Sequence, residues 1–351
     1  MRTFESDAKE RIDWVDYAKG WCIVLVVMMH STLGVGEAMG GESWLHDFVA
    51  WARPFRMPDF FLVAGLFLSR SIELDWSRYL DRKVVHFAYF YLLWMLIQGV
   101  PKLLVAEGGD PGALVSGLAY ALVQPFGTLW FIYLLPIFFV VTKLLRRAPV
   151  EAVFLVAALA QMAQIETESI VVEEFAARYV YFYAGYAFAP HVFALADRAR
   201  RHVGVSLALL LAWGVVNALA VRYGIAARPG FSLIFGFAGA AAVVVFSALL
   251  AQAQALPFLR ALGSRSIVVY LAFFLPMAAA RVLLVKSGLI ADVGLVSALV
   301  TVTAVVVPLI LHALARDGRL RFLFERPLWA RLPIIERRVA RRGLSGAGAN
   351  P

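Results

Sequence analysis

Apolar stretches of membrane-spanning length recur along the whole chain, separated by short segments of charged residues, glycine or proline. A helix that crosses the hydrocarbon core of a bilayer needs about 20 predominantly apolar residues. The pattern therefore predicts about ten transmembrane helices, near residues 17–36, 57–72, 84–105, 128–145, 149–165, 176–194, 203–222, 230–252, 266–285 and 289–314. The segment at 57–72 is short and contains Asp59, so we expect that span to be shortened or bent.

Composition supports a membrane protein and argues against a soluble enzyme. Of the 351 residues, 62% are hydrophobic and 16% are charged, and the mean hydropathy is +0.76. Soluble domains average about 45–50% apolar and about 25% charged residues. The aromatic fraction of 13% also excludes a disordered chain, because such chains carry few large apolar side chains. The expected fold class is an all-α polytopic membrane protein.

The placement of lysine and arginine predicts the orientation in the membrane. With the N-terminus in the cytoplasm, about three quarters of the 33 basic residues fall on the cytoplasmic side, where loops retain them. An even number of helices keeps the arginine-rich C-terminus inside, so both termini are expected in the cytoplasm. The net charge of +9 then reflects topology and gives no argument for nucleic acid. We expect an integral-membrane domain over 1–315 and a basic cytoplasmic tail over 316–351 that is solvated or binds anionic lipid.

Ionisable residues inside apolar segments are the informative ones, because each is costly in a bilayer unless it has a partner or a function. His30 follows a run of nine apolar residues, and Lys19 precedes it by eleven positions. Eleven helical residues complete about three turns, so both side chains project from one face, about 16 Å apart. This geometry suits an elongated anionic ligand that enters from the cytoplasm and reaches the imidazole. The alternative is a structural histidine and a lysine that snorkels to the interface.

A second polar cluster surrounds the proline at position 58. Pro58 lacks a backbone donor and disfavours helix at the residue before it, so a break is expected just before Asp59. Arg56 is close enough in sequence to pair with Asp59 across that break. Asp59 and Arg70 are again eleven residues apart, which predicts an outer polar end and an inner cation on one helix face. The alternative is a structural Arg56–Asp59 pair and an Arg70 that only sets topology.

Trp130 and Arg178 are two further candidates, and each lies at the outer end of a predicted span. There they either bind a substrate or have interfacial roles, Trp130 in the aromatic belt and Arg178 as a cation that snorkels to the interface. Cys22 is the single cysteine, so no internal disulfide forms, and the histidines lack metal-ligand spacing. No phosphate-binding glycine loop or nucleophile motif of common hydrolases occurs, so we expect no metal and no ATP hydrolysis.

Four stretches of the chain together match a known set of motifs. Asp-Tyr-Ala-Lys-Gly at 16–20, followed by an apolar run to His30, fits a basic residue, ten residues and a histidine. The segment 55–70 is similar to a Met-Pro-x-Phe-Phe, Ser-Gly-x-x-x-x-Arg stretch. Leu-Trp-Phe at 129–131 and the Leu-Gly-x-x-Ser, Ile-x-x-Tyr-Leu segment at 262–271 are supporting matches. By these motifs the sequence resembles the membrane-bound acyltransferase-3 family of bacterial enzymes that O-acylate sugars.

The sequence departs from the family pattern at two positions. Ala64 replaces the serine that commonly precedes Gly65. The late motif often continues to a second histidine, whereas Phe273 and Phe274 follow here, so any role of that histidine is absent or supplied differently.

The resemblance implies acyl transfer from a cytoplasmic acyl-CoA, most simply acetyl-CoA, to a hydroxyl of an extracytoplasmic or lipid-linked glycan or glycolipid. It makes His30 the general base for direct transfer, with a transient acyl-histidine as the open alternative. The phosphates of CoA are expected to bind four basic residues, Lys19, Arg70, Arg82 and Lys83, and Asp16 is expected to position Lys19. The acceptor is expected to bind Arg56, Asp59, Trp130 and Arg178. The expected location is the bacterial cytoplasmic (inner) membrane, and no protein partner is predicted.

Two other function classes compete with the enzyme. A transporter or flippase would use His30 and Asp59 as a substrate or proton site, but such proteins often show internal repeats, and none is visible here. A non-catalytic scaffold would leave the spacing of Lys19 and His30 unexplained.

Overall fold

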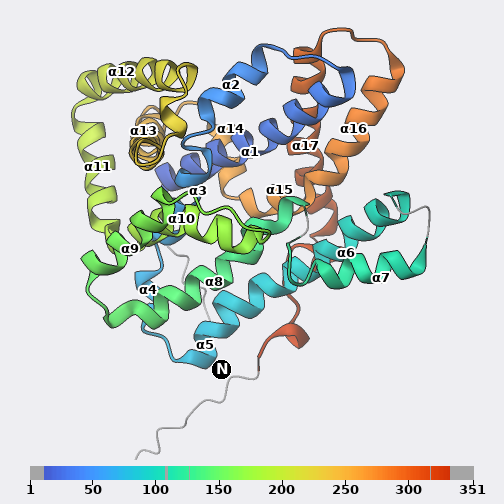
Figure 1. The fold of residues 1–351 in the computed structure, drawn as a ribbon, viewed down its shortest axis with the longest axis horizontal. Coiled ribbons are helices and arrows are strands. Elements are labelled where there is room, and N and C mark those ends of the chain that lie inside the picture. Colours follow the sequence, from blue (N-terminus) through green and yellow to red (C-terminus); the bar gives the residue numbers. More distant parts are fainter. Residues whose placement is uncertain (1–11, 107–109, 126, 317, 333–351) are drawn as a thin grey trace, which may run out of the picture.

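Helices make up almost the whole structure, a computed structural model that describes residues 12–106, 110–125, 127–316 and 318–332 (Figure 1). No β-strand occurs among these residues. The predicted all-α class is therefore confirmed. The first eleven residues and the last part of the predicted tail, 333–351, lie outside the described residues.

The helices vary widely in length. Those of ten residues or more are α1 (Asp13–Met39), α3 (Arg56–Gly65), α6 (His86–Ala106), α7 (Pro111–Tyr120), α8 (Trp130–Leu144), α9 (Val150–Met162), α10 (Ile170–Ala187), α11 (Ala189–Arg201), α12 (Val203–Arg222), α13 (Phe231–Ala253), α16 (Phe274–Ser287) and α17 (Val293–Ala315). The shorter ones are α2 (Trp44–Ala52), α4 (Ser69–Ile72), α5 (Trp76–Leu80), α14 (Pro257–Gly263) and α15 (Ser266–Ala272). Single turns of other helix types include the π-helical η1 (Asp81–Val85), η2 (Gly127–Leu129), η3 (Leu145–Arg147), η4 (Ile225–Ala227), η5 (Arg319–Leu323) and η6 (Leu328–Ala330).

Several of these helices are long and apolar enough to cross a membrane. Within the described residues, 6 single helices qualify by length and composition, and the bent pair α15–α16 raises the number to 7. The other predicted spans coincide with helices that are short, broken or charged, namely α3–α4, α9 and α10–α11. The chain is thus a polytopic membrane protein, while the count of ten crossings and the cytoplasmic termini stay predictions.

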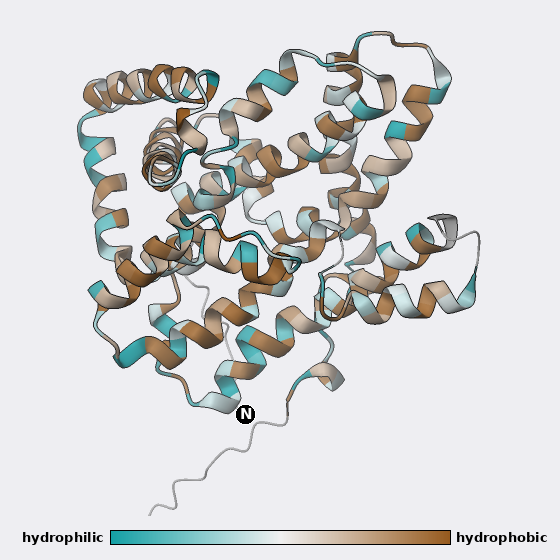
Figure 2. Cartoon of the chain, viewed as in Figure 1, coloured by the Kyte–Doolittle hydropathy of each residue, from teal (hydrophilic) through white to brown (hydrophobic). Residues whose placement is uncertain are grey.

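The outer surface of the helices is apolar, as a bilayer requires. On α12, leucines and valines point away from the protein, and Leu211 is 74% exposed. Hydrophobic residues cover most of the helices in the hydropathy colouring (Figure 2). Backbone donors and acceptors in such a helix are satisfied within the helix itself, so only its side chains face lipid.

Helix α1 lies at the centre of the arrangement and contacts α3, α13, α14, α16 and α17 (Figure 1). Asp13 and Asp16 lie in its first turn, where carboxylates interact favourably with the positive end of the helix dipole. The helix ends at Gly40, whose φ of 68° is left-handed and whose backbone N–H bonds back to the carbonyl of Gly36. One unbroken helix therefore carries both Lys19 and His30.

The expected break near Pro58 lies a little earlier in the chain. A turn at 53–55 precedes α3, so Pro58 occupies the first turn, where its missing N–H costs nothing. The helix then stops at Gly65, and tight backbone bonds such as Leu68 N–H to Gly65 O carry the chain to α4. The predicted span at 57–72 is thus broken, as expected. One consequence is a correction: Asp59 and Arg70 do not share one helix, so the eleven-residue spacing does not place them on one face.

Two other predicted spans are interrupted. The apolar stretch at 176–194 breaks at Phe188, and Pro190 then occupies the first turn of α11. Helices α15 and α16 meet at an angle of 56° around Phe273. Pro276 has no N–H to offer the carbonyl of Ala272, so the helical bonding pattern cannot continue through this point.

Glycines let two pairs of helices approach backbone to backbone. At the crossing of α1 and α14, a Cβ on Gly20 would clash with the carbonyl oxygen of Leu259, and one on Gly263 with that of Asp16. At the crossing of α3 and α10, a Cβ on Gly65 or Gly185 would clash with a backbone carbonyl of the facing helix. Small residues serve this purpose in membrane proteins generally.

The chain after α17 folds back onto η1 and the first half of α6, although a solvated or lipid-bound extension was expected. Asp81 accepts hydrogen bonds from Arg326 Nη2 at 2.7 Å and from Leu332 N–H at 2.8 Å. Trp94 Nε1 donates to the carbonyl of Leu323 at 3.0 Å. The physical reason for the difference is the Asp81–Arg326 ion pair, which is almost fully buried at 7% and 8% exposure. Each charge needs the other once both are removed from water.

We predict that Gly185→Ala destabilises the protein. The new methyl group meets the backbone of α3, which cannot rotate away, so α3 and α10 must separate. Overpacking of this kind costs about 1–3 kcal/mol. Thermal unfolding of the purified protein in detergent should show a lowered midpoint. Gly214→Ala on α12 is the matched control, since a Cβ there meets no atom within 4 Å. Equal midpoints for the two variants would contradict the close approach.

Removal of the Arg326 side chain should loosen the C-terminal segment. Arg326→Ala leaves Asp81 buried without its counter-charge, which costs about 3 kcal/mol when a buried pair is broken. Arg321→Ala is the control, because its i,i+4 pair with Glu325 is exposed and such pairs contribute about 0.5 kcal/mol. Limited proteolysis measures the release of the segment. Equal cleavage rates in both variants would show that the pair does not hold it.

Candidate active site

One face of α1 lines two neighbouring cavities. Lys19 and Cys22 line the first, which we call the Lys19 cavity and whose volume is 130 Å³. Val26, Met29 and His30 line the second, the His30 cavity of 200 Å³. These positions recur at helical spacing along α1, so the prediction that Lys19 and His30 share a face is confirmed.

The Lys19 cavity lies where α1 meets α3, α8 and α15. Its remaining wall is mostly apolar and consists of Phe60, Val63, Ala64, Phe131, Leu135, Ser266, Ile267 and Tyr270. Lys19 Nζ lies 3.9 Å from a carboxylate oxygen of Asp16, which agrees with the predicted support of Lys19 by that residue. The lysine side chain is 37% exposed, so this end of the passage faces the surface.

The His30 cavity brings together four of the ten predicted site residues, each from a different helix. Besides His30, its wall contains Arg56 of α3, Trp130 of α8 and Arg178 of α10, all named from the sequence as candidates. Thr128 and Glu174 were not predicted. Glu174 lies four residues before Arg178, a spacing typical of ion pairs on a helix, so the sequence did contain a signal for it.

A layer of aromatic side chains separates the two cavities. Phe60, Phe131 and Tyr270 line both of them. The ring centroids of Phe60 and Phe131 lie 4.5 Å apart, and those of Phe131 and Tyr270 lie 5.5 Å apart. Tyr270 is fixed in place, because its hydroxyl donates to the carbonyl of Thr128 at 2.6 Å and accepts from Ile132 N–H at 3.3 Å. The partition between the cavities is therefore made of side chains.

The residue that departs from the family's late motif lies against the imidazole. The ring centroids of Phe273 and His30 are 5.7 Å apart. Phe273 occupies the bend between α15 and α16 and is fully buried. An apolar ring thus covers the side of His30 next to that bend.

Arg56 and Asp59 do not form the pair that the sequence allowed. Among the described residues, neither oxygen of Asp59 has a hydrogen-bond partner, and the same is true of Nε and Nη1 of Arg56. Arg56 lines the His30 cavity, whereas Asp59 is 1% exposed and lies beside Cys22. The structure therefore brings Arg56, but not Asp59, to the cavity wall.

The three other basic candidates lie apart from the Lys19 cavity. Arg70 is exposed, with its guanidinium carbon 5.0 Å from the ring centroid of Phe67. Arg82 is exposed on η1, and the Lys83 ammonium lies 4.5 Å from the ring centroid of Phe139. The predicted cluster of four cations is not assembled around this cavity, because Arg70 follows the break after α3 and the other two belong to the α5–α6 segment.

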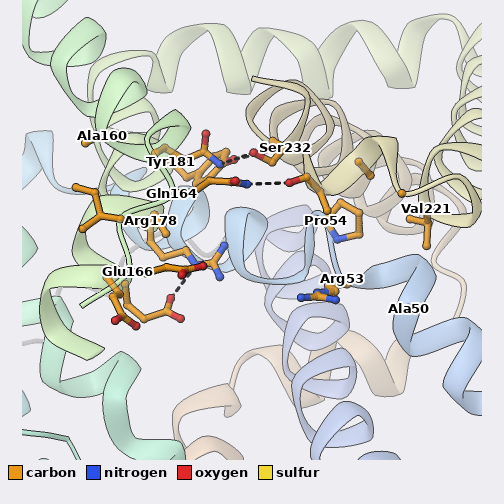
Figure 3. Close-up of a pocket in the computed structure, with 18 residues that line it drawn as sticks. Ala50, Arg53, Pro54, Ala160, Gln164, Glu166, Arg178, Tyr181, Val221 and Ser232 are labelled. Atoms are coloured by element: carbon orange, nitrogen blue, oxygen red, sulfur yellow. Dashed lines mark hydrogen bonds and ion pairs between the residues drawn. The ribbon is translucent and has the colours of Figure 1, made fainter. Parts of the chain in front are cut away.

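A third and larger cavity of 520 Å³ lies next to the His30 cavity, and we call it the outer cleft (Figure 3). Arg178 and Glu174 line both. The two side chains pair, with Arg178 Nε 2.8 Å from a carboxylate oxygen of Glu174. The sequence did not single out this cleft, because its polar residues come from four separate parts of the chain.

The described residues contain no group of three or more histidine, cysteine, aspartate or glutamate side chains placed to hold a metal ion. The polar groups at hand are an imidazole, two guanidinium groups, a carboxylate, a threonine and a tyrosine hydroxyl. Such a set can move a proton and stabilise negative charge beside an apolar passage.

Comparison with known proteins agrees with these features. Inner membrane protein YcfT of Escherichia coli (strain K12) is 27% identical over 178 residues, which cover 43% of this chain and 49% of that protein. The match therefore spans about half of the relative's length. No solved structure is significantly similar to the chain. The chain is a multi-pass protein of the inner membrane.

The family model described as an acyltransferase domain, of the acyltransferase-3 type, matches residues 12–313. That range begins at the first described residue and ends within α17, so it includes every residue of the Lys19 and His30 cavities. The chain therefore belongs to the membrane-bound acyltransferase-3 family.

Proposed function

We propose that the protein transfers an acyl group, most simply acetyl, from a cytoplasmic acyl-CoA to a hydroxyl of an extracytoplasmic or lipid-linked glycan. The observation that carries the proposal is the single face of α1 that presents Lys19 in one cavity and His30 in the next. A cation at the surface and an imidazole at depth suit a long polyanionic donor whose reactive group is at its far end.

The donor enters at the Lys19 cavity. The half-exposed ammonium group of Lys19 binds a phosphate of CoA through charge-assisted hydrogen bonds. The cavity is too small for a nucleotide, so the adenosine part stays at the cytoplasmic surface, where Arg70, Arg82 and Lys83 are the available cations. The apolar walls suit the uncharged pantetheine arm.

The thioester reaches His30 by crossing the aromatic layer of Phe60, Phe131 and Tyr270. The wall of the Lys19 cavity is mostly apolar, and these three rings line both cavities. Tyr270 is held by two hydrogen bonds, so the rings of Phe60 and Phe131 are the ones that move aside.

The transfer itself needs a base and a partner for the developing oxyanion. His30 accepts the proton of the acceptor hydroxyl while its oxygen attacks the thioester carbonyl carbon and forms the new C–O bond. The unpartnered N–H groups of Arg56 line the same cavity and stabilise the negative charge on the carbonyl oxygen. When the C–S bond breaks, the CoA thiolate leaves and receives the proton from His30.

A covalent variant of this scheme uses His30 as the nucleophile. The acyl group would then move from sulfur to the imidazole and from there to the acceptor hydroxyl. The two routes differ in whether labelled protein accumulates when acyl-CoA is supplied without acceptor. In both, Trp130 and Arg178 bind the acceptor, because they line the same cavity as His30.

Substitution of the imidazole should abolish transfer and preserve donor binding. We expect His30→Gln to lower O-acylation about 10²–10⁴-fold, the usual contribution of general acid–base catalysis. Radiolabelled acetyl-CoA and membranes that contain the acceptor glycan measure the transfer, and equilibrium binding of acetyl-CoA to the purified protein measures the donor site.

His202→Gln is the matched control, since His202 is exposed outside the cavities. Full activity of a folded His30→Gln protein would exclude the mechanism. A protein that moves a glycan across the membrane without acylating it would instead support the transporter alternative.

Removal of the surface cation should weaken donor binding. Lys19→Ala removes a charge-assisted hydrogen bond of about 1.5–3 kcal/mol, which corresponds to a rise of about 10-fold to 100-fold in the Kd for acetyl-CoA. The transfer rate at saturating donor should change less than the KM. Lys286→Ala on α16 is the control, because that lysine is exposed and lines neither cavity. An unchanged Kd in Lys19→Ala would place the donor elsewhere.

A further inference from the structure

The outer cleft has no role in the transfer chemistry described so far, although it is the largest of the three cavities. It lies at the ends of α9 and α12 and at the beginnings of α10 and α13 (Figure 3). Near the opposite ends of these helices the chain carries arginines at 146–147 before α9, at 198–201 before α12, and at 260 and 265 in the segment after α13. The charge distribution therefore predicts that the cleft opens on the face away from the cytoplasm.

The walls of the cleft present both donors and acceptors of hydrogen bonds. Gln161 Nε2 donates to Ser232 Oγ at 3.0 Å, and Gln164 Nε2 donates to the carbonyl of Ala227 at 2.8 Å (Figure 3). The other polar atom of this side chain, Gln161 Oε1, has no partner among the described residues. It is buried, and the whole residue is only 8% exposed. A buried acceptor without a partner is costly unless a ligand supplies the donor.

Size and polarity match a compound rich in hydroxyl groups. The volume of 520 Å³ lies within the range of about 300–1,000 Å³ typical of small-molecule sites. Each hydroxyl of a sugar both donates and accepts, so it can satisfy Gln161 Oε1 and bond to the carboxylates and hydroxyls nearby. An apolar ligand, such as a lipid chain, would leave these groups without partners.

The charges that line the cleft disfavour an anionic ligand. Three carboxylates lie in its wall, Glu166, Glu173 and Glu174, and two guanidinium groups, Arg53 and Arg178. The pairing of Arg178 with Glu174 leaves two carboxylates and one arginine. A negatively charged sugar would meet unfavourable like charges, which cost several kcal/mol at close range.

The cleft adjoins the His30 cavity, and the two share one ion pair in their walls. Glu174 and Arg178 lie in the walls of both, and their side chains are 24% and 26% exposed. A ligand in the cleft thus reaches His30 by passing these two side chains. The donor arrives from the other side, through the aromatic layer.

We propose that the outer cleft is the acceptor site, that its ligand is an uncharged polyhydroxy compound such as a neutral sugar unit, and that the ligand presents one hydroxyl to His30 beside Arg178. This inference rests on the acyl transfer proposed above, and it assigns to the second substrate a position and a charge class. The two substrates then meet at His30 from opposite faces of the membrane.

A bulky group attached inside the cleft tests the assignment. Cys22 is the only cysteine in the chain and is buried, so Ala227→Cys and Ala50→Cys each provide one accessible thiol, on two different walls of the cleft. Spheroplasts, from which the outer membrane has been removed, are treated with a membrane-impermeant polyethylene glycol maleimide. We expect labelling without permeabilisation and a loss of O-acylation of at least tenfold, with acetyl-CoA binding changed less than twofold.

Glu42→Cys is the matched control, because Glu42 is exposed in the loop after α1 and lies outside the cleft. Its labelled form should keep full activity. Labelled Ala227→Cys and Ala50→Cys proteins that still acylate would overturn the assignment, as would labelling that requires permeabilised spheroplasts. If the wild-type protein also fails to move an acyl group from acetyl-CoA, the proposed function itself is wrong.

Mass spectrometry of the glycan from wild-type cells tests the charge class independently. The acylated sugar unit should be uncharged at neutral pH. An acyl group found on a uronic acid or another anionic sugar would contradict the inference even if labelling of the cleft blocks the reaction.

Discussion

The arrangement of the site depends on two helix crossings at which backbones touch. Gly20 and Gly263 bring α14 onto α1 just where Lys19 begins the passage, and Gly65 and Gly185 bring α3 onto α10. The second contact sets the distance between the helices that carry Arg56 and Arg178. Apolar side chains give little drive for helix association in lipid, so close packing of this kind holds the cavity walls together. A larger residue at any of these positions displaces a wall, and the polar groups lose their common cavity.

Few ionisable groups lie in the membrane spans, so the few that line the cavities determine what chemistry the cavities can carry out. A charged or polar group at this depth is costly unless it is paired or reaches a cavity. Arg178 is paired with Glu174, whereas Nε and Nη1 of Arg56, which lines the His30 cavity, have no partner within the described part of the chain. An apolar passage with a few unpartnered donors at its end is a suitable environment for stabilising a charge that appears only during the reaction. The same logic applies to Gln161 Oε1 in the outer cleft.

Much of this organisation could be predicted from the sequence, wherever the relevant residues share one helix. The spacing of Lys19 and His30 correctly predicted a shared face, because α1 is unbroken from Asp13 to Met39. The same reasoning was wrong for Asp59 and Arg70, because the helix stops at Gly65 between them. Contacts between distant segments were beyond this kind of reasoning. Helical periodicity says which side of a helix a residue occupies, but not which helix it meets, so neither the outer cleft nor the docking of Arg326 on Asp81 was expected.

In the proposed mechanism, the donor passes from Lys19 through the aromatic layer to His30. The acceptor reaches His30 through a separate entrance on the opposite side. The most direct test is a cryo-electron microscopy structure of the full chain with a thioether analogue of acetyl-CoA. We predict density for the phosphates beside Lys19, for the pantetheine arm between Phe60 and Phe131, and for the acyl group in the His30 cavity. Density for the donor in the outer cleft, or a bound donor whose acyl group lies away from His30, would contradict the account.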